Sequence, residues 1–388
     1  MDASLNRRKF VQASVCAGCA LSMGGTLLAA PGAQAADALP LTKELSDQEA
    51  LYYDKLDDLK IQCKLCPKEC RVADKERGYC GVRENKGGVY TTLVYGRPCT
   101  LHVDPIEKKP LFHYMPGTAA FSIATAGCNM ECKFCQNWDI SQFRPEQIRM
   151  IDLSPQKTAD LAKETKSQTI AYTYSEPVIF YEYMYDAAKA ARELGVGSVM
   201  ISNGYIQEKP LRALCKQLTG VKIDFKAFTE KFYKETCSGE LAPVLKALKI
   251  IREEGVWLEL VVLIIPTLND GEDENKSMAE WIVKNLGDQV PVHLTRYHPT
   301  YKLKITSTPV KTLEKLRSLM MKEGLKYVYL GNVAGHPSEN TKCPECGAML
   351  IRRLGFQTQI ENLEDGECKK CHTKIPGVWS DPLVKISG

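Results

Sequence analysis

The fold of the chain is decided by residues 119–137, which read AAFSIATAGCNMECKFCQN. The run Ala120–Thr125 is short, apolar and partly β-branched, which predicts a buried strand. The strand leads into a loop in which Cys128, Cys132 and Cys135 stand in CxxxCxxC spacing. Thiols grouped this closely indicate metal or redox chemistry rather than isolated core cysteines.

Three thiols leave a cubane cluster incompletely ligated. They hold only three irons of a [4Fe-4S] cluster, so the fourth iron keeps an open position. An electron-rich cluster with an open iron can bind and reduce a chelating substrate. A structural zinc knuckle and a ferredoxin-type carrier are the alternatives. Both need a fourth protein ligand, and no cysteine follows Cys135 within ten residues.

The surrounding sequence predicts an α/β fold with a parallel sheet. From about Ala119 to Asn332, short β-branched runs alternate with amphipathic stretches, which implies right-handed βαβ units. Helices are expected over 180–194 and 243–254, each followed by a glycine. Six or seven units fit a partial TIM-like (β/α)6 barrel better than a full barrel of about 250 residues. The expected strands are Ala120–Thr125, Thr169–Thr173, Ser198–Ser202, Val221–Phe225, Trp257–Ile265, Val290–Thr295 and Tyr327–Gly331.

In such a barrel, catalytic groups gather at the carboxyl ends of the strands. Asp224 and Lys226 alternate along their strand onto one inward face, where they form a ligand-binding pair or an ordinary ion pair. His293, Arg296 and His298 crowd the end of a later strand. Cationic and titratable groups this close together are costly unless paired, so a substrate or product anion is expected beside them. These five residues are the catalytic candidates.

Cys128, Cys132 and Cys135, with Phe134 before the last thiol, resemble the radical S-adenosylmethionine (radical SAM) motif. That resemblance implies that the amine and carboxylate of S-adenosylmethionine chelate the open iron. One electron then breaks the sulfonium bond and gives methionine and a 5′-deoxyadenosyl radical, which abstracts a hydrogen atom from a protein or a small molecule. A non-enzymatic multi-metal iron-sulfur redox or scaffold protein is the alternative.

The segment 174–177 (Tyr-Ser-Glu-Pro) resembles the GGEP segment that holds the amino group of S-adenosylmethionine, with Tyr-Ser in place of Gly-Gly. Its carboxylate can still accept a charge-assisted hydrogen bond from an ammonium. The apolar run broken by a turn at 264–270 is as expected of a loop against an adenine. The cofactor-binding candidates are Glu176, Ser202, Asn203, Asp224, Pro266 and Asn269.

Two further cysteine groups flank the barrel. The first, Cys63, Cys66, Cys70 and Cys80, supplies four thiols, enough to close a tetrahedral site; zinc is the leading occupant and a second iron-sulfur cluster the runner-up. The second has two CxxC knuckles and is typical of a zinc ribbon, with a rubredoxin-like iron site as the chemical competitor. Its ligands are Cys343, Cys346, Cys368 and Cys371.

Together, these motifs are similar to the radical SAM proteins of the AmmeMemoRadiSam system, relatives of pyruvate formate-lyase activating enzymes. The match covers nearly everything after the amino-terminal signal, including 104–110, 135–138, 297–299 and 329–333. It implies a low-potential electron donor such as ferredoxin or flavodoxin. The chain lacks the inserted ferredoxin domain of several glycyl-radical activators, which weakens an activating role.

The amino terminus and the composition bound the remaining possibilities. Arg7 and Arg8 precede an apolar, small-residue run over 11–30, which resembles a Tat signal for export of a folded holoprotein, although S-adenosylmethionine is made in the cytosol. The net charge of +4 gives no reason to expect nucleic acid, and no other stretch is long enough for a permanent membrane span. The expected domains are 1–36 (Tat-like signal), 41–118 (Cys-rich, with a helical lead-in over 41–60), 119–335 (barrel) and 341–388 (zinc-ribbon-like).

Overall fold

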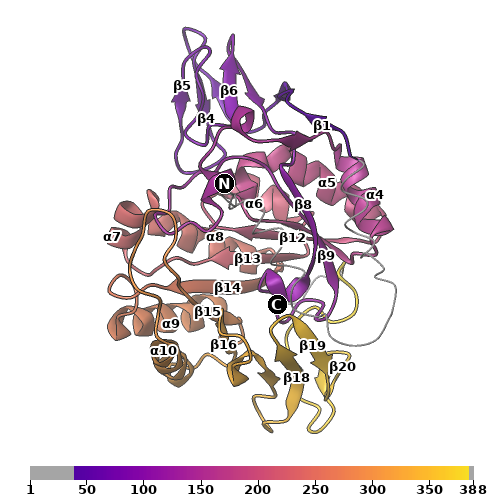
Figure 1. Ribbon diagram of the computed structural model, residues 1–388, viewed down its shortest axis with the longest axis vertical. Coiled ribbons are helices and arrows are strands. Elements are labelled where there is room, and N and C mark those ends of the chain that lie inside the picture. Colours follow the sequence, from indigo (N-terminus) through magenta and orange to yellow (C-terminus); the bar gives the residue numbers. More distant parts are fainter. Residues whose placement is uncertain (1–38, 384–388) are drawn as a thin grey trace, which may run out of the picture.

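An eight-stranded sheet forms the centre of the computed structural model, which describes residues 39–383 (Figure 1). The strand order is β16-β15-β14-β13-β12-β11-β9-β8. Each strand expected from the sequence is present, and its ends lie within two residues of the expected ones. The predicted leader at 1–36 lies outside the described residues. The strands are β8 (Thr100–Pro105), β9 (Ala119–Ala124), β11 (Thr169–Tyr172), β12 (Gly197–Ser202), β13 (Gly220–Asp224), β14 (Trp257–Ile264), β15 (Val292–Arg296) and β16 (Val328–Gly331).

Parallel pairing places the strand ends that carry polar residues at one edge of the sheet. Thr169 of β11 pairs with Ala120 of β9 and with Gly197 of β12, and the same parallel pairing continues to β16. Only β8 runs antiparallel to its neighbour, β9. The predicted α/β class is confirmed. Within residues 39–383 no pairing joins the edge strands β8 and β16, so the hydrogen bonds describe an open sheet.

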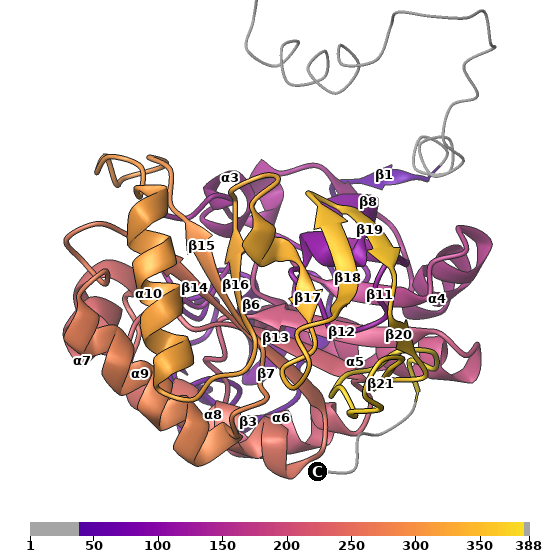
Figure 2. The ribbon, with the colours of Figure 1, turned by 90° about the horizontal axis from the view of Figure 1, so that it is seen from below.

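Helices fill the crossovers, and Figure 2 shows α8, α9 and α10 along one side of the sheet. The predicted helices over 180–194 and 243–254 are confirmed as α5 and α8, which end before Gly195 and Gly255. Both glycines have a positive φ, which ends a helix at little cost. No helix of the described part is long and apolar enough to cross a membrane. The helices are α3 (Trp138–Ser141), α4 (Pro155–Glu164), α5 (Tyr181–Glu193), α6 (Glu208–Cys215), α7 (Glu230–Phe232), α8 (Leu241–Glu253), α9 (Glu272–Leu286) and α10 (Val310–Lys322).

The amino-terminal part, before β8, forms small antiparallel sheets at the top of Figure 1. The helical lead-in expected over 41–60 is wrong, because this segment contains only β1, β2 and β3. Its backbone pairs with neighbouring strands, and Tyr52, Asp58 and Leu59 have left-handed φ values that a helix cannot contain. The strands are β1 (Leu41–Thr42), β2 (Gln48–Glu49), β3 (Tyr53–Lys55), β4 (Ile61–Cys63), β5 (Arg71–Val72), β6 (Arg83–Lys86) and β7 (Val89–Thr92); β10 (Met150–Ile151), which follows β9 in the chain, pairs with β1.

The carboxyl-terminal module lies at the opposite end of the molecule from the amino-terminal sheets (Figure 1). It docks on the segment between β8 and β9 through the buried Arg353, whose Nη2 donates to the Phe112 carbonyl at 2.8 Å. His113 contacts the Pro376 carbonyl at 2.7 Å and the Tyr329 hydroxyl at 2.6 Å. The strands are β17 (Thr341–Lys342), β18 (Met349–Leu354), β19 (Gln357–Ile360), β20 (Leu363–Glu364) and β21 (Glu367–Cys368).

Candidate active site

The CxxxCxxC loop begins at the carboxyl end of β9 and brings its three thiols together. Burial raises the pKa of the Cys128 and Cys135 thiols, and the charge of Cys132 raises both further. Cys128 Sγ accepts the backbone N–H of Met130 at 3.4 Å. A bound metal displaces the protons of its thiol ligands, and three thiols on one loop are suited to ligating iron.

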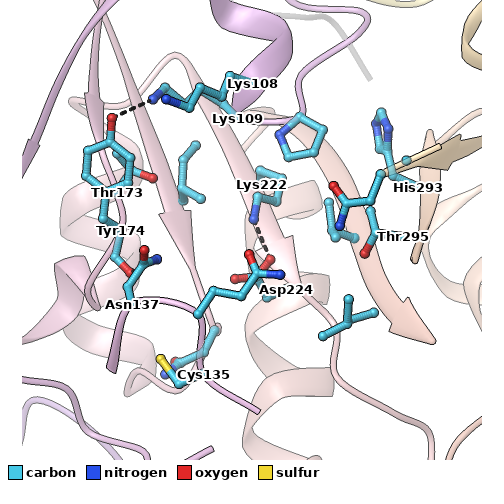
Figure 3. A pocket seen from close by; sticks show the side chains of 18 of the residues that line it. Lys108, Lys109, Cys135, Asn137, Thr173, Tyr174, Lys222, Asp224, His293 and Thr295 are labelled. Carbon is cyan, nitrogen blue, oxygen red and sulfur yellow. Dashed lines mark hydrogen bonds and ion pairs between the residues drawn. The ribbon is translucent and has the colours of Figure 1, made fainter. Parts of the chain in front are cut away.

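A cavity of about 760 Å³ opens over this loop. Figure 3 shows side chains from several strand ends pointing into it. The hairpin between β18 and β19 also reaches it through Gly355 and Phe356, so the carboxyl-terminal module forms part of its wall. The cavity gathers most of the site residues that the sequence predicts, namely Cys128, Cys132, Cys135, Glu176, Asn203, Asp224, Lys226 and His293.

Glu176 is a buried carboxylate held in place from two sides. Ser202 Oγ donates to it at 2.6 Å and the Asn203 backbone N–H at 2.8 Å, while the Val178 N–H donates at 3.1 Å. Burial raises its pKa to about 7, partly offset by these hydrogen bonds. Asn203, whose N–H binds Glu176, also donates its Nδ2 to Asn129 Oδ1 at 2.9 Å, so Glu176 stands close to the iron-binding loop. Ser202 and Asn203 therefore orient Glu176.

The site has room for a ligand ammonium at Glu176. A carboxylate offers about four acceptor positions, and the three donors leave one of them open. The neighbouring Ser175 Oγ is buried in the cavity wall and has no hydrogen-bond partner among the described residues. A buried polar atom without a partner is costly unless a ligand or water satisfies it. These residues fit the amino group of S-adenosylmethionine.

Three charges alternate along and beyond β13. Lys222 donates to Asp224, and Lys226 Nζ lies 3.3 Å from the other Asp224 oxygen. Burial opposes ionisation of Asp224, but the two lysines outweigh it and hold its pKa at about 2. Attraction from Asp224 and Cys132 overcomes burial and raises the pKa of Lys226. Asp224 and Lys226 form an ion pair in the cavity wall, and their role toward a ligand stays a prediction.

The three candidates on and after β15 separate in the structure. His293 lines the cavity, but its Nε2 is bonded to the buried Glu259 at 2.7 Å, and burial lowers its pKa. Arg296 donates to the Thr308 carbonyl at 2.8 Å, and His298 contacts Ser307 at 3.0 Å. Neither Arg296 nor His298 is part of the cavity wall. The expected cluster of three is therefore not formed.

The loop after β14 also differs from its predicted role. Pro266 and Asn269 do not line the cavity. The Asn269 side chain instead fastens the loop, because its Nδ2 donates to the Lys226 and Leu263 carbonyls at 2.8 and 2.9 Å. Its Oδ1 accepts the Ile265 N–H at 2.7 Å. Asn269 therefore positions the end of β13, where Lys226 lies.

Sequence reasoning missed several residues at the site. Lys222 lies two residues before Asp224 and therefore on the same strand face. The alternation that predicted Lys226 could also have predicted Lys222. Asp104 of β8 binds the Lys109 ammonium at 2.5 Å and accepts a short hydrogen bond from Tyr174 (Figure 3 shows the two partners, Lys109 and Tyr174). Tyr174 has a φ of 65°, in keeping with the glycine that the resembled motif has at this position. Cys237 donates to Cys132 and lowers the pKa of that thiol.

The terminal cysteines form a closed site. The four sulfurs of Cys343, Cys346, Cys368 and Cys371 lie within 4.8 Å of one another, with Sγ separations of 3.5 Å (Cys343 to Cys371) and 3.7 Å (Cys346 to Cys368). A zinc ion with Zn–S bonds of about 2.3 Å holds its thiolates about 3.8 Å apart. The predicted cysteine cluster is confirmed, and its size fits a single metal ion.

Comparison with known proteins agrees with this site. The family model of the radical SAM superfamily matches residues 122–282. Uncharacterized protein MJ0808 of Methanocaldococcus jannaschii is 46% identical over 331 residues, which cover 84% of this chain and 98% of the relative. Uncharacterized protein MJ0674 of the same organism is 25% identical over 266 residues, covering 64% of this chain and 71% of the relative.

The chain belongs to the radical SAM superfamily, in one family with MJ0808, and is a radical SAM enzyme. The superfamily implies S-adenosylmethionine and an iron-sulfur cluster, as well as an electron donor and a substrate. A domain of a pyruvate-formate lyase-activating enzyme from Bacteroides vulgatus is 16% identical, with a TM-score of 0.38, over 42% of this chain and 98% of that one. A radical SAM methyltransferase from Sphaerobacter thermophilus is 15% identical, with a TM-score of 0.45, over 56% and 67%.

Proposed function

We propose that the enzyme reductively cleaves S-adenosylmethionine in this cavity and abstracts hydrogen from a protein or small-molecule substrate. The cluster and S-adenosylmethionine, when bound, supply a 5′-deoxyadenosyl radical. The observation that carries the proposal is that the three thiols of the CxxxCxxC loop and the Glu176 carboxylate face one cavity. Cys237 contacts Cys132, but it does not line the cavity, so the three loop cysteines are the proposed ligands.

Individual residues then have separate roles. Glu176 accepts the amino group of S-adenosylmethionine, with Ser175 as a second polar contact, while Ser202 and Asn203 keep the carboxylate in place. Lys226 pairs with Asp224, is attracted by Cys132, and balances the negative charge of the cluster loop. Its partner Asp224 is the proposed contact for the ribose of S-adenosylmethionine or for the substrate.

Several finer assignments accompany this proposal. The motif resemblance supports membership of the AmmeMemoRadiSam group. The same resemblance supports the proposal that the sheet curves into a partial (β/α)6 barrel. Zinc is proposed at the terminal cysteine site, whose sulfur spacing fits one ion. Ferredoxin or flavodoxin is proposed as the electron donor.

The test is the release of 5′-deoxyadenosine from anaerobically reconstituted full-length protein given dithionite and S-adenosylmethionine. We expect release with intact protein and only background release without dithionite. Absence of the product from protein that holds its full complement of iron would overturn the proposed reaction. Transfer of deuterium from a labelled candidate into 5′-deoxyadenosine would then identify the substrate.

A further inference from the structure

The amino-terminal quartet, Cys63, Cys66, Cys70 and Cys80, is arranged for a body larger than one ion. The four cysteines are neighbours, because the Cys63 N–H donates to the Cys70 carbonyl at 2.9 Å, the Glu69 N–H to the Cys66 carbonyl at 3.1 Å, and the N–H of Tyr79, next to Cys80, to Cys70 Sγ at 3.4 Å. Yet within residues 39–383, only the terminal site brings three or more ligand atoms within 4.8 Å of one another. A single zinc ion requires that closeness, because its thiolates lie about 3.8 Å apart. In a cubane each thiolate binds a different iron, so the four thiolates lie farther apart than they do around one zinc ion.

The backbone around the quartet is prepared for ligated sulfur. Tyr79 N–H donates to Cys70 Sγ at 3.4 Å. Hydrogen bonds to sulfur stabilise thiolate ligands and tune the potential of a cluster.

A buried arginine beside the quartet has one nitrogen without a hydrogen-bond partner in the described chain. Arg83 is 1% exposed; its Nη2 donates to Glu182 at 2.5 Å and its Nε to the Ile179 carbonyl at 3.3 Å. Its Nη1 is buried without any hydrogen-bond partner in the described chain. After Glu182, the strongest attractions on this guanidinium come from the thiols of Cys63 and Cys80. The inorganic sulfides of a cluster offer acceptors that a zinc ion lacks.

The quartet also touches the catalytic loop. A Cβ placed on Gly127, the residue before Cys128, would lie 2.8 Å from the Cys80 carbonyl oxygen and 2.7 Å from Val82. Lys68, between Cys66 and Cys70, donates to the Ser238 carbonyl at 2.5 Å, next to the Cys237 that contacts Cys132. The two cysteine loops are therefore in van der Waals contact, with no intervening layer of protein.

We propose that the quartet binds a second [4Fe-4S] cluster, ligated on every iron, that passes electrons to the cluster of the CxxxCxxC loop. A one-electron donor of the ferredoxin or flavodoxin class reduces the second cluster by one electron. That electron then moves to the catalytic cluster, and the second cluster returns to its oxidised state; no bond or proton is exchanged. The binding of the cluster stands independently of the proposed function, whereas the electron relay rests on it.

The binding test uses full-length protein reconstituted anaerobically with iron and sulfide. Intact protein should hold about eight irons and eight sulfides per chain. A variant with Cys128, Cys132 and Cys135 all replaced by Ala leaves the quartet intact and should keep about four of each, with the absorption of a cubane. If that variant holds no sulfide and takes up zinc at the quartet instead, the proposal is overturned.

The relay test uses the double substitution Cys66→Ala and Cys80→Ala. Retained iron at the catalytic loop and retained metal at the terminal site show that this variant folds. It should still release 5′-deoxyadenosine with dithionite but lose at least about tenfold in rate with reduced flavodoxin. If the variant keeps the same fraction of the intact protein's rate with flavodoxin as with dithionite, the relay is refuted. Intact protein that holds eight irons but gives no product would instead refute the proposed function.

Discussion

The two four-cysteine sites, at opposite ends of the molecule, have the same ligands and different sizes. The terminal quartet draws its sulfurs within 4.8 Å of one another, and two of its members, Cys346 and Cys371, are exposed. The amino-terminal quartet is more open, lies against a buried guanidinium, and touches the catalytic loop. Ligand type alone therefore does not decide which metal a site takes. The spacing of the sulfurs and the groups around them decide it.

The largest expected effect comes from the catalytic loop. Like those of the amino-terminal quartet, its sulfurs do not all lie within 4.8 Å of one another. Cys132→Ala removes one of three ligands, so release of 5′-deoxyadenosine should fall to background and about half of the iron should be lost. Metal at the terminal site should be unchanged, as metal analysis will show. The matched control is Cys215→Ala in α6, which should keep both iron and activity. Product release by Cys132→Ala would contradict the ligand assignment.

Cys346→Ala tests the opposite end of the comparison. Zinc contributes about 10 kcal/mol or more to small zinc-dependent modules, so loss of a ligand should unfold the terminal module locally. We expect loss of one metal ion per chain and rapid proteolysis within 341–383, with the iron content unchanged. Because Gly355 and Phe356 of this module line the cavity, release of 5′-deoxyadenosine should fall as the module unfolds, although the catalytic loop keeps its iron. Loss of iron in this variant would show that the sites are not separate.

Unlike the closed terminal site, the catalytic site has an open position for S-adenosylmethionine. Glu176→Gln tests the proposed contact between this carboxylate and the amino group of that cofactor. A hydrogen bond to a charged group contributes about 1.5–3 kcal/mol, so S-adenosylmethionine should bind about tenfold to a hundredfold more weakly. Equilibrium dialysis or calorimetry on the reconstituted variant measures this. Glu164→Gln, at the exposed end of α4 and outside the cavity wall, serves as a charge-matched control whose affinity for S-adenosylmethionine should be nearly unchanged. An intact affinity in Glu176→Gln would remove the carboxylate from the cofactor site.

The smallest effect is the pH dependence of the same contact. Burial raises the pKa of Glu176 from 4.5 to about 7, so the carboxylate is ionised above this pH and protonated below it. Since a protonated carboxyl accepts the hydrogen bond of the amino group more weakly, the Kd for S-adenosylmethionine should rise about fivefold from pH 7 to pH 6. Glu176→Gln should flatten this dependence. A wild-type Kd that is constant across the range would be inconsistent with the assigned role.

Local patterns in the sequence predicted the framework well. The strand before Cys128, the CxxxCxxC loop and the later strands were all readable, because hydrophobic periodicity and ligand spacing are local properties. Glu176 was found because it follows a strand in a recognisable segment. The terminal cysteine site was equally clear from its two knuckles.

Long-range contacts were not readable in the same way. Asp104 reaches the site because β8 adds antiparallel to β9, an arrangement that alternating βαβ units do not predict. The contact of Cys237 with Cys132 joins residues that are distant in sequence. Arg296 was misplaced because its guanidinium is used by the Thr308 carbonyl. The charged lead-in over 41–60 pairs as strands, since tertiary pairing overrides helix propensity.

The open coordination position is tested most directly by electron paramagnetic resonance of anaerobic, dithionite-reduced protein before and after addition of S-adenosylmethionine. The double variant Cys66→Ala/Cys80→Ala, with only the catalytic cluster left, gives the simplest spectrum. A shifted signal on addition of the cofactor is the predicted result. An identical signal, at a cofactor concentration that saturates binding, would mean that the iron has no free position and would contradict the account.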